Sequence, residues 1–212
     1  MGMDWHFGAQ AFATAFTIID PIGMIPITAA TTAHFDRAKR NRIVDLAVVV
    51  AAVVILAMGV VGPYILDYLG ITLPAFGIAG GILLLLIAID MLFARPTGAR
   101  ATSEEERVAR EGENPAVFPL AIPMLAGPGT IATVLLLVNA AHGNPARDGL
   151  VVLAYAVALA IAWLCMRGAA RYLHKLGTTG IHVVSRVLGI ILAALAVQFI
   201  INGVVQTPLF HH

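Results

Sequence analysis

Apolar residues run along this chain in six long stretches separated by shorter polar segments. The stretches cover residues 7–32, 43–69, 71–94, 116–140, 149–173 and 181–206. A helix needs about 20 predominantly apolar residues to cross the hydrocarbon core of a bilayer, and each stretch is long enough. The pattern therefore predicts an all-α polytopic membrane protein with six transmembrane helices.

The composition supports a lipid bilayer as the surroundings of the protein. Of the 212 residues, 59% are hydrophobic and 12% are charged, whereas a soluble domain carries about 25% charged residues. The formal net charge is +1, so nothing indicates a nucleic-acid partner. The first stretch lacks a basic flank and a small-residue cleavage site, which predicts a retained span rather than a cleaved signal peptide.

Basic residues gather in alternate loops, and this predicts the orientation of the spans. They are Arg37, Lys39, Arg40 and Arg42 after the first stretch, Arg95, Arg100, Arg107 and Arg110 after the third, and Arg167, Arg171 and Lys175 near the end of the fifth. The loops on the other side carry Arg147 alone. Because cytoplasmic loops are enriched in Lys and Arg, we expect both termini outside.

The polar segment 95–115 divides the chain into two sets of three spans. We expect a three-helix repeat at 1–94, a cytoplasmic polar linker at 95–115 and a second repeat at 116–212, together forming one membrane domain. Three spans per half place the second half in the membrane upside down relative to the first. The predicted architecture is thus a 3+3 inverted repeat, which many transporters share.

Sequence similarity between the halves supports this duplication. Residues 81–92 align without gaps on residues 189–200, at an offset of 108 positions. Pro21 aligns on Pro128 at an offset of 107. Two nearly equal offsets at separate places favour one duplicated unit.

Prolines and glycines interrupt the first and fourth spans in corresponding positions. The interrupted segments are Asp20–Pro26 and Pro123–Gly129. Proline removes a backbone donor from a helix, and glycine permits backbone angles that other residues resist. A membrane offers no water to satisfy the freed groups, so the sequence predicts helices broken mid-membrane around a buried polar site.

Each break creates ends with opposite electrostatic character. The start of a half-helix presents N–H groups suited to a carboxylate, and the end of the preceding half presents carbonyls suited to an ammonium group or sodium ion. An amino-acid zwitterion carries both charges, and we expect the N–H groups around Ile22–Met24 and Gly129–Thr130 to hold its carboxylate. The candidate substrate-binding residues are Thr17, Asp20, Pro21, Ile22, Gly23, Met24, Pro26, Pro123, Ala126, Gly127, Pro128, Gly129 and Thr130.

Asp20 is the most informative single residue. A carboxylate within a span is costly unless it is paired or hydrated, which makes it a candidate functional group. Asp20 could bind the substrate ammonium, carry a proton or ligate a cation. Alternatively, it caps a half-helix that begins at Pro21, and this role is compatible with the others. No firm metal site is predicted beyond this candidate cation ligand.

Asp90 and Gln198 occupy equivalent positions of the aligned segments. One interpretation places them at the membrane interface or in hydrogen bonds between helices. The other makes them gates at the two mouths of a pathway. The spacing of Gly77 and Gly81 fits a close helix contact and is compatible with a homodimer or a monomer.

Motifs of catalysis and of direct ATP coupling are absent from the sequence. It contains no HExxH, CxxC or GxSxG, and no Gly-Lys-Ser/Thr follows Gly127-Pro128-Gly129-Thr130. We therefore expect a protein that is not an enzyme and has no cofactor apart from a coupling ion, H⁺ or Na⁺.

The segments Ile19–Pro26 and Pro119–Ile131 resemble those of the MarC family, also called the small neutral amino-acid transporter family of prokaryotic inner-membrane proteins. The resemblance extends over essentially the whole chain. Met24 departs from it, since a polar residue such as Asn is expected there, and this affects the expected substrate preference. The resemblance implies ion-coupled transport of small neutral amino acids such as glycine and alanine, and related exporters of similar size suggest efflux.

These observations predict a secondary active transporter of small zwitterions in the inner membrane. Three alternatives stay open: a passive channel or ion permease, an exporter of another small metabolite or drug, and a non-transporting membrane scaffold. The sequence leaves the substrate, the direction, the coupling ion and the oligomeric state undetermined.

Overall fold

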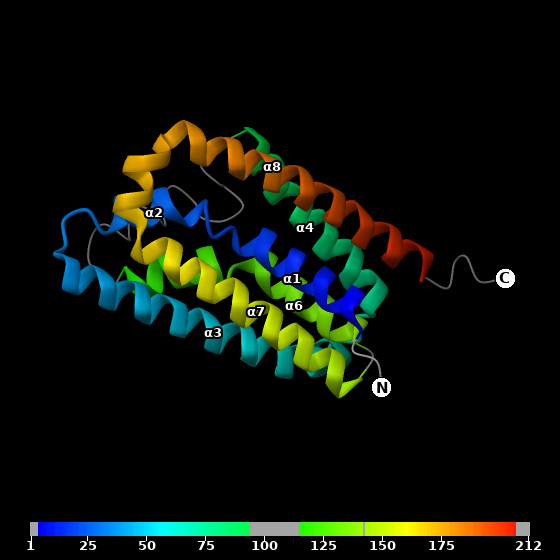
Figure 1. Cartoon of the computed structure of the whole chain (residues 1–212). Coiled ribbons are helices and arrows are strands. Elements are labelled where there is room, and N and C mark those ends of the chain that lie inside the picture. The colour runs from blue at the N-terminus through cyan, green and yellow to red at the C-terminus, as the bar shows by residue number, and fades with distance from the viewer. Residues whose placement is uncertain (1–3, 94–114, 142, 207–212) are drawn as a thin grey trace.

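The computed structural model describes residues 4–93, 115–141 and 143–206, and it is helical throughout these ranges apart from short connections (Figure 1). The elements, in chain order, are α1 (Trp5–Ile19), α2 (Met24–Thr31), α3 (Arg37–Tyr68), α4 (Leu73–Phe93), the π-helical segment η1 (Ala116–Leu125), α6 (Pro128–Ala140), α7 (Pro145–Arg167) and α8 (Ala169–Val205).

The prediction of an all-α polytopic membrane protein is confirmed. In the described ranges, five helices are long and apolar enough to cross a membrane, with Trp5–Thr31 taken as one span. The count becomes six when η1 and α6, which meet at an angle of 50°, are taken as one bent span. The long helices run roughly side by side, as the parallel ribbons of α3, α7 and α1 make visible (Figure 1).

Two helix starts differ from the predicted boundaries because polar residues cap them. The helix predicted at 43–69 begins at Arg37, where the Asp36 carboxylate accepts a hydrogen bond from the Lys39 amide at 2.7 Å. The helix predicted at 149–173 begins at Pro145, since the Asn144 side chain accepts from the Ala146 amide at 3.0 Å. Both residues are favoured N-caps.

The fifth and sixth spans are joined more tightly than predicted. α7 ends at Arg167, Gly168 forms the turn, and α8 begins at Ala169, twelve positions before the predicted start at 181. The polar residues that separate the apolar stretches therefore continue the helix. Side chains such as Arg, Lys, Leu and Ala have high helix propensity, so polarity alone did not mark a loop here.

α4 and α8 form the most extensive helix pair, and their glycines make reciprocal contacts. A Cβ added at Gly81 would lie 2.8 Å from the Ala196 carbonyl oxygen and 3.1 Å from the Ile200 nitrogen. One added at Gly189 would lie 3.3 Å from both the Ala88 carbonyl oxygen and the Leu92 nitrogen. Gly81 and Gly189 are 108 positions apart, and so are their contact residues, Ala88 and Ala196 as well as Leu92 and Ile200. Such reciprocity is expected where two equivalent helices pack about a local two-fold axis.

α1 occupies the centre of the bundle, between α7, α6 and α8 (Figure 1). In the most apolar window of each span, 61% of residues are buried for Trp5–Thr31 but only 28% for α3. Thr14 and Thr17, in the second half of α1, are therefore enclosed by protein rather than exposed to lipid. This arrangement is the one in which polar groups at membrane depth are tolerated.

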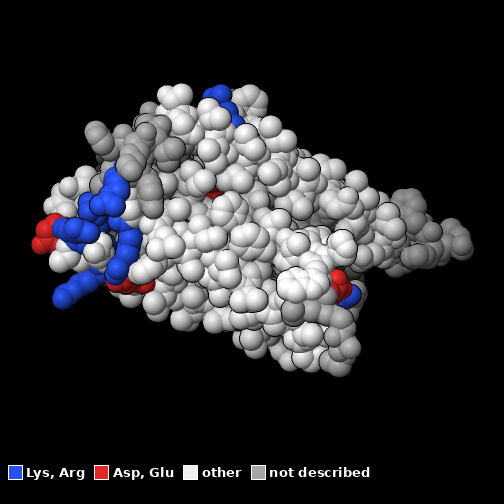
Figure 2. All heavy atoms as spheres, in the orientation of Figure 1, with Lys and Arg blue, Asp and Glu red and all other residues white. Residues whose placement is uncertain are grey.

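Charged residues are segregated along the long axis of the molecule. Figure 2 shows Lys and Arg side chains concentrated at the end where α3 begins and α7 turns into α8. The start of α1 and the end of α8 lie at the opposite end (Figure 1). The helix ends nearest the two termini thus share a side away from the basic cluster, while the membrane face to which each side belongs stays a prediction.

The polar linker predicted at 95–115 lies outside the described residues, except for Pro115. The division into repeats at 1–94 and 116–212 is therefore untested as a whole.

Candidate functional site

The first break interrupts the central span between α1 and α2. α1 ends at Ile19, and Asp20 follows with φ 48° and ψ 65°, the left-handed region. Its amide still donates to the Phe16 carbonyl at 3.0 Å, and Pro21 then ends the helical ladder because it has no N–H. Aspartate is among the few residues other than glycine that adopt this conformation with some frequency.

Asp20 also shapes the turn through its side chain. Its carboxylate oxygen Oδ1 accepts a hydrogen bond from the Gly23 amide at 3.0 Å, and its carbonyl accepts from the Met24 amide at 3.1 Å. Asp20 is 2% exposed. The expected N-cap role is not found: α2 begins at Met24 with Gly23 as its N-cap and no side-chain cap bond among the described residues, and Asp20 is instead the C-cap of α1.

These bonds revise the expected carboxylate site at the first break. The Gly23 and Met24 amides already donate to Asp20, so they are not available to a substrate carboxylate. The first break instead contributes the acceptor oxygens of the Asp20 carboxyl group. The first break is therefore better suited to a positively charged group than to an anion.

Threonines surround the first break on both of its helices. Thr17 donates to the Ala13 carbonyl at 2.7 Å, and Thr32 donates to the Thr28 carbonyl at 2.5 Å. The hydroxyls of Thr14 and Thr28 are fully buried and have no hydrogen-bond partner among the described residues. Burying a hydroxyl without a partner costs about 1–3 kcal/mol, so these two groups are candidates to bind a ligand.

The second break is built mainly from prolines and glycines. In η1, Phe118 and Ile122 have extended backbones, and each precedes a cis proline, Pro119 or Pro123. Proline disfavours the helical conformation in the residue before it, which explains the two extended positions. Ala126 and Gly127 then connect η1 to α6.

The start of α6 is buried apart from Pro128, and no side chain among the described residues caps it. Gly127 is the N-cap, Pro128 follows it, and Gly127 makes no side-chain cap bond within the described residues. The Gly129 and Thr130 amides belong to that turn, whose N–H groups have no intrahelical acceptor. Gly129 is buried and Thr130 is 2% exposed. This end of α6 offers donors and a positive dipole to an anion.

Close packing explains the two glycines at the second break and brings it next to the first. A Cβ added at Gly127 would lie 2.1 Å from the Pro123 carbonyl oxygen. One added at Gly129 would lie 3.0 Å from Cδ1 of Ile18, two residues before Asp20, and 2.6 Å from Cδ1 of Ile87 on α4. The start of α6 therefore packs against the end of α1.

Tyr155 was not among the sequence candidates, although it contacts the second break. It is buried at 3% exposure on α7, and its hydroxyl lies 3.5 Å from the Thr130 carbonyl oxygen. Thr133 donates to the Gly129 carbonyl at 2.5 Å. A signal existed in the sequence, because a tyrosine hydroxyl within an apolar span needs a partner.

α2 packs against the turn between α7 and α8. Ile25 and Ala169 form a small buried cluster with Ile22 and Cys165 at its edge. The Cys165 thiol lies within electrostatic range of Asp20. The segment after the first break is thus held by residues of the second half of the chain.

The other candidate substrate residues differ in exposure. Ile22, Gly23 and Pro26 are half-buried, and Pro128 is exposed. The buried members of the set are Thr17, Pro21, Met24, Pro123, Ala126 and Gly127.

The two candidate gates lie on α4 and α8. Gln198 is exposed, and its side-chain amide donates to the Asn202 side chain at 2.8 Å on the same helix. Asp90 is half-buried near the end of α4. Gln198 therefore makes a hydrogen bond within α8, and gating by either residue stays a prediction. The described residues contain no cluster of three His, Cys, Asp or Glu side chains able to hold a metal ion.

Comparison with known proteins gives a match along nearly the whole chain. A family model described as MarC family integral membrane protein matches residues 5–207. A UPF0056 membrane protein of Methanocaldococcus jannaschii is 37% identical, over 95% of this chain and 98% of its own length. A UPF0056 membrane protein of Archaeoglobus fulgidus is 36% identical, over 94% of this chain and 93% of its own length. The UPF0056 membrane protein YvbG of Bacillus subtilis is 33% identical, over 95% of this chain and 95% of its own length. No solved structure gives a significant match.

Proposed function

This chain belongs to the MarC family of integral membrane proteins, and we propose that it is a secondary active transporter of small neutral amino acids. Glycine and alanine represent the expected substrate class, H⁺ or Na⁺ is the proposed coupling ion, and the proposed location is the prokaryotic inner membrane. The protein acts without an enzymatic step, and export is the direction we favour.

The main support is the meeting of two broken spans with complementary charge. The first turn of α6, at the buried Gly129, packs against Ile18, next to the Asp20 break. A substrate carboxylate would accept hydrogen bonds from the Gly129 and Thr130 amides. Its ammonium group would face Asp20 and the carbonyls at the end of α1. A small zwitterion satisfies both ends at once.

Local features of the two halves support alternating access by an inverted repeat. The caps Asp36 and Asn144 lie 108 positions apart, the same offset that relates the glycine contacts of α4 and α8. Equivalent helices of opposite orientation allow one half to rock against the other around a fixed site. In this proposal both termini face outward and the basic loops are cytoplasmic.

The lining of the site favours a small substrate. Threonines, glycines and backbone groups surround the breaks, and Met24 is fully buried. Drug-sized sites are mostly apolar and aromatic, which this site is not.

Uptake of radiolabelled glycine and alanine into proteoliposomes tests the proposal. We expect saturable uptake driven by an imposed proton or sodium gradient, and its loss in Asp20→Asn. Asp67→Asn is the matched control, because Asp67 is exposed in the last turn of α3. Conduction without saturation would support a channel instead. Absence of uptake by folded, inserted protein under either gradient would reject the amino-acid proposal.

A further inference from the structure

A pocket of about 430 Å³ lies between α3, α6 and α7, and its lining residues lie outside the broken segments 20–26 and 123–129. Its walls are apolar apart from one carboxylate and two tyrosines. The lining residues on α3 lie between Ala52 and Tyr64, those on α7 lie between Asp148 and Leu159, and Val134 and Val138 belong to α6. The volume is within the range of ligand pockets, about 300–1,000 Å³.

The pocket has the length of one membrane leaflet. Ala52 and Tyr64 are twelve residues apart on α3, which corresponds to about 18 Å along a helix at 1.5 Å per residue. The hydrocarbon core of a bilayer is about 30 Å thick, so one leaflet contributes about half of that. A lipid acyl chain parallel to the helices would match the pocket in length.

The pocket opens toward the lipid-facing side of the bundle. Leu56 is 50% exposed, Val60 is 66% exposed and Val152 is 52% exposed. Its inner wall is formed by residues that the core encloses, including Tyr155. An acyl chain could therefore enter sideways from the bilayer without disturbing helix packing.

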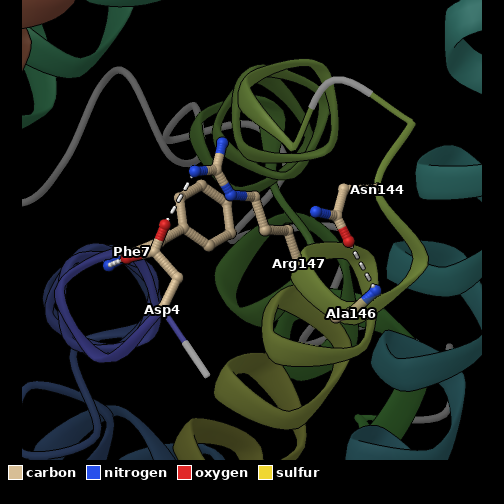
Figure 3. A network of polar contacts seen from close by, with 5 residues as sticks. All are labelled: Asp4, Phe7, Asn144, Ala146 and Arg147. Carbon is tan, nitrogen blue, oxygen red and sulfur yellow. Dashed lines mark hydrogen bonds and ion pairs between the residues drawn. The ribbon is translucent and has the colours of Figure 1, made fainter. Parts of the chain in front are cut away.

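One end of the pocket carries an unsatisfied carboxylate. Asp148 lies in the first turn of α7, and its Oδ1 is enclosed without a hydrogen-bond partner among the described residues. The neighbouring Arg147 does not neutralise it, because that guanidinium pairs with Asp4 at 2.7 Å and lies 5.4 Å above the Phe7 ring (Figure 3). A cationic group bound at this end would satisfy the Asp148 oxygen.

We propose that this pocket binds a phospholipid whose headgroup carries a primary ammonium. One acyl chain occupies the space between α3, α6 and α7, and the ammonium donates hydrogen bonds to Asp148. The apolar length and the carboxylate at its end together specify an amphipathic molecule with an ammonium group in its headgroup. The lining residues lie outside the segments 20–26 and 123–129, although the Tyr155 hydroxyl also reaches the Thr130 carbonyl. The inference is tested by lipid retention and does not depend on the transported substrate.

Native mass spectrometry of the full-length protein in detergent tests the proposal. Phosphatidylethanolamine and phosphatidylglycerol with identical acyl chains are added at equal concentration. We expect wild type to retain the ethanolamine lipid about tenfold more, the ratio that one charge-assisted contact supplies. Asp148→Asn should bring the ratio close to one, whereas Asp67→Asn should leave it unchanged.

A second variant tests the acyl-chain part of the site. Ala156 lines the pocket at an exposed position of α7, so Ala156→Phe fills the space without disturbing the core. We expect it to reduce retention of both lipids severalfold. Ala160→Phe is the control, on an exposed position of α7 outside the pocket lining. Equal retention of the two lipids by wild type, or retention unaffected by Asp148→Asn or Ala156→Phe, would overturn the proposal.

Discussion

The break after α1 and the break before α6 lie at positions that the predicted repeat aligns, but different residues form them. At the first break, a left-handed aspartate caps α1 and binds the Gly23 amide through its side chain. At the second, prolines and glycines redirect the backbone, and no side chain caps the helix that follows. One break thus carries a carboxyl group, and the other presents amides of a helix start that no described side chain caps. Divergence after a duplication can produce this polarity and suit a zwitterion.

The largest expected effect comes from removing the charge at the first break. Asp20→Asn keeps a residue that tolerates the left-handed conformation and can still accept from the Gly23 amide. We expect amino-acid uptake to fall about a hundredfold, since losing one partner of a buried charge pair costs about 2–5 kcal/mol. Initial uptake rates in proteoliposomes measure it. An unchanged rate with an unchanged unfolding temperature would mean that Asp20 is a structural cap alone.

The next effect concerns the backbone of the second break. In Gly127→Ala the new methyl would collide with the Pro123 carbonyl, whose backbone must shift. We expect a loss of about 1–3 kcal/mol of stability, typical of overpacking, together with reduced uptake. Thermal unfolding in detergent measures it. Gly149→Ala, where an added Cβ meets nothing within 4 Å, should be neutral or stabilising.

Smaller effects are expected for the buried threonine without a partner. Thr14→Val removes a fully buried hydroxyl that has no hydrogen-bond partner among the described residues. We expect stability to rise by up to about 1 kcal/mol while uptake falls severalfold, because only a bound ligand uses this hydroxyl. Thr31→Val is the control, since its hydroxyl bonds the Ile27 carbonyl within its own helix. Uptake unchanged in Thr14→Val would remove the hydroxyl from the site.

The smallest effect is expected far from both breaks, where α1 meets α7. The Phe7 amide and the Arg147 guanidinium hold the pKa of Asp4 below its ordinary value of 3.8 (Figure 3). The stabilisation of the fold by ionised Asp4 is therefore complete above pH 3.8, the ordinary pKa of aspartate. It is lost as the pH falls through the lower pKa that Asp4 has in the folded protein. Solvent screens this exposed pair, so the effect should be small.

Thermal unfolding of wild type and Asp4→Asn between roughly pH 6 and about pH 3 measures this contribution. We expect a small advantage of wild type that shrinks at the acidic end. If wild type instead became more stable relative to Asp4→Asn as the pH falls, the lowered pKa of Asp4 in the folded protein would be contradicted.

The position of the two breaks could be predicted from the sequence because prolines and glycines act locally. Pro21 cannot donate to Thr17 in any fold, and Pro123 disfavours a helical Ile122 whatever surrounds it. The partners of the freed amides could not be predicted. Whether Gly23 donates to Asp20 or to a substrate depends on a backbone angle that the sequence alone does not specify.

The sequence by itself determined the membrane class, the apolar spans and the two interruptions, since these follow from hydropathy and from the chemistry of proline. Only the tertiary structure decided that the start of α6 packs against Ile18, that Tyr155 reaches the Thr130 carbonyl, and that Gln198 faces outward. Apolar helices of similar composition can pack on many faces. Side-chain shape and close glycine contacts select one packing, and this selection brings distant residues together.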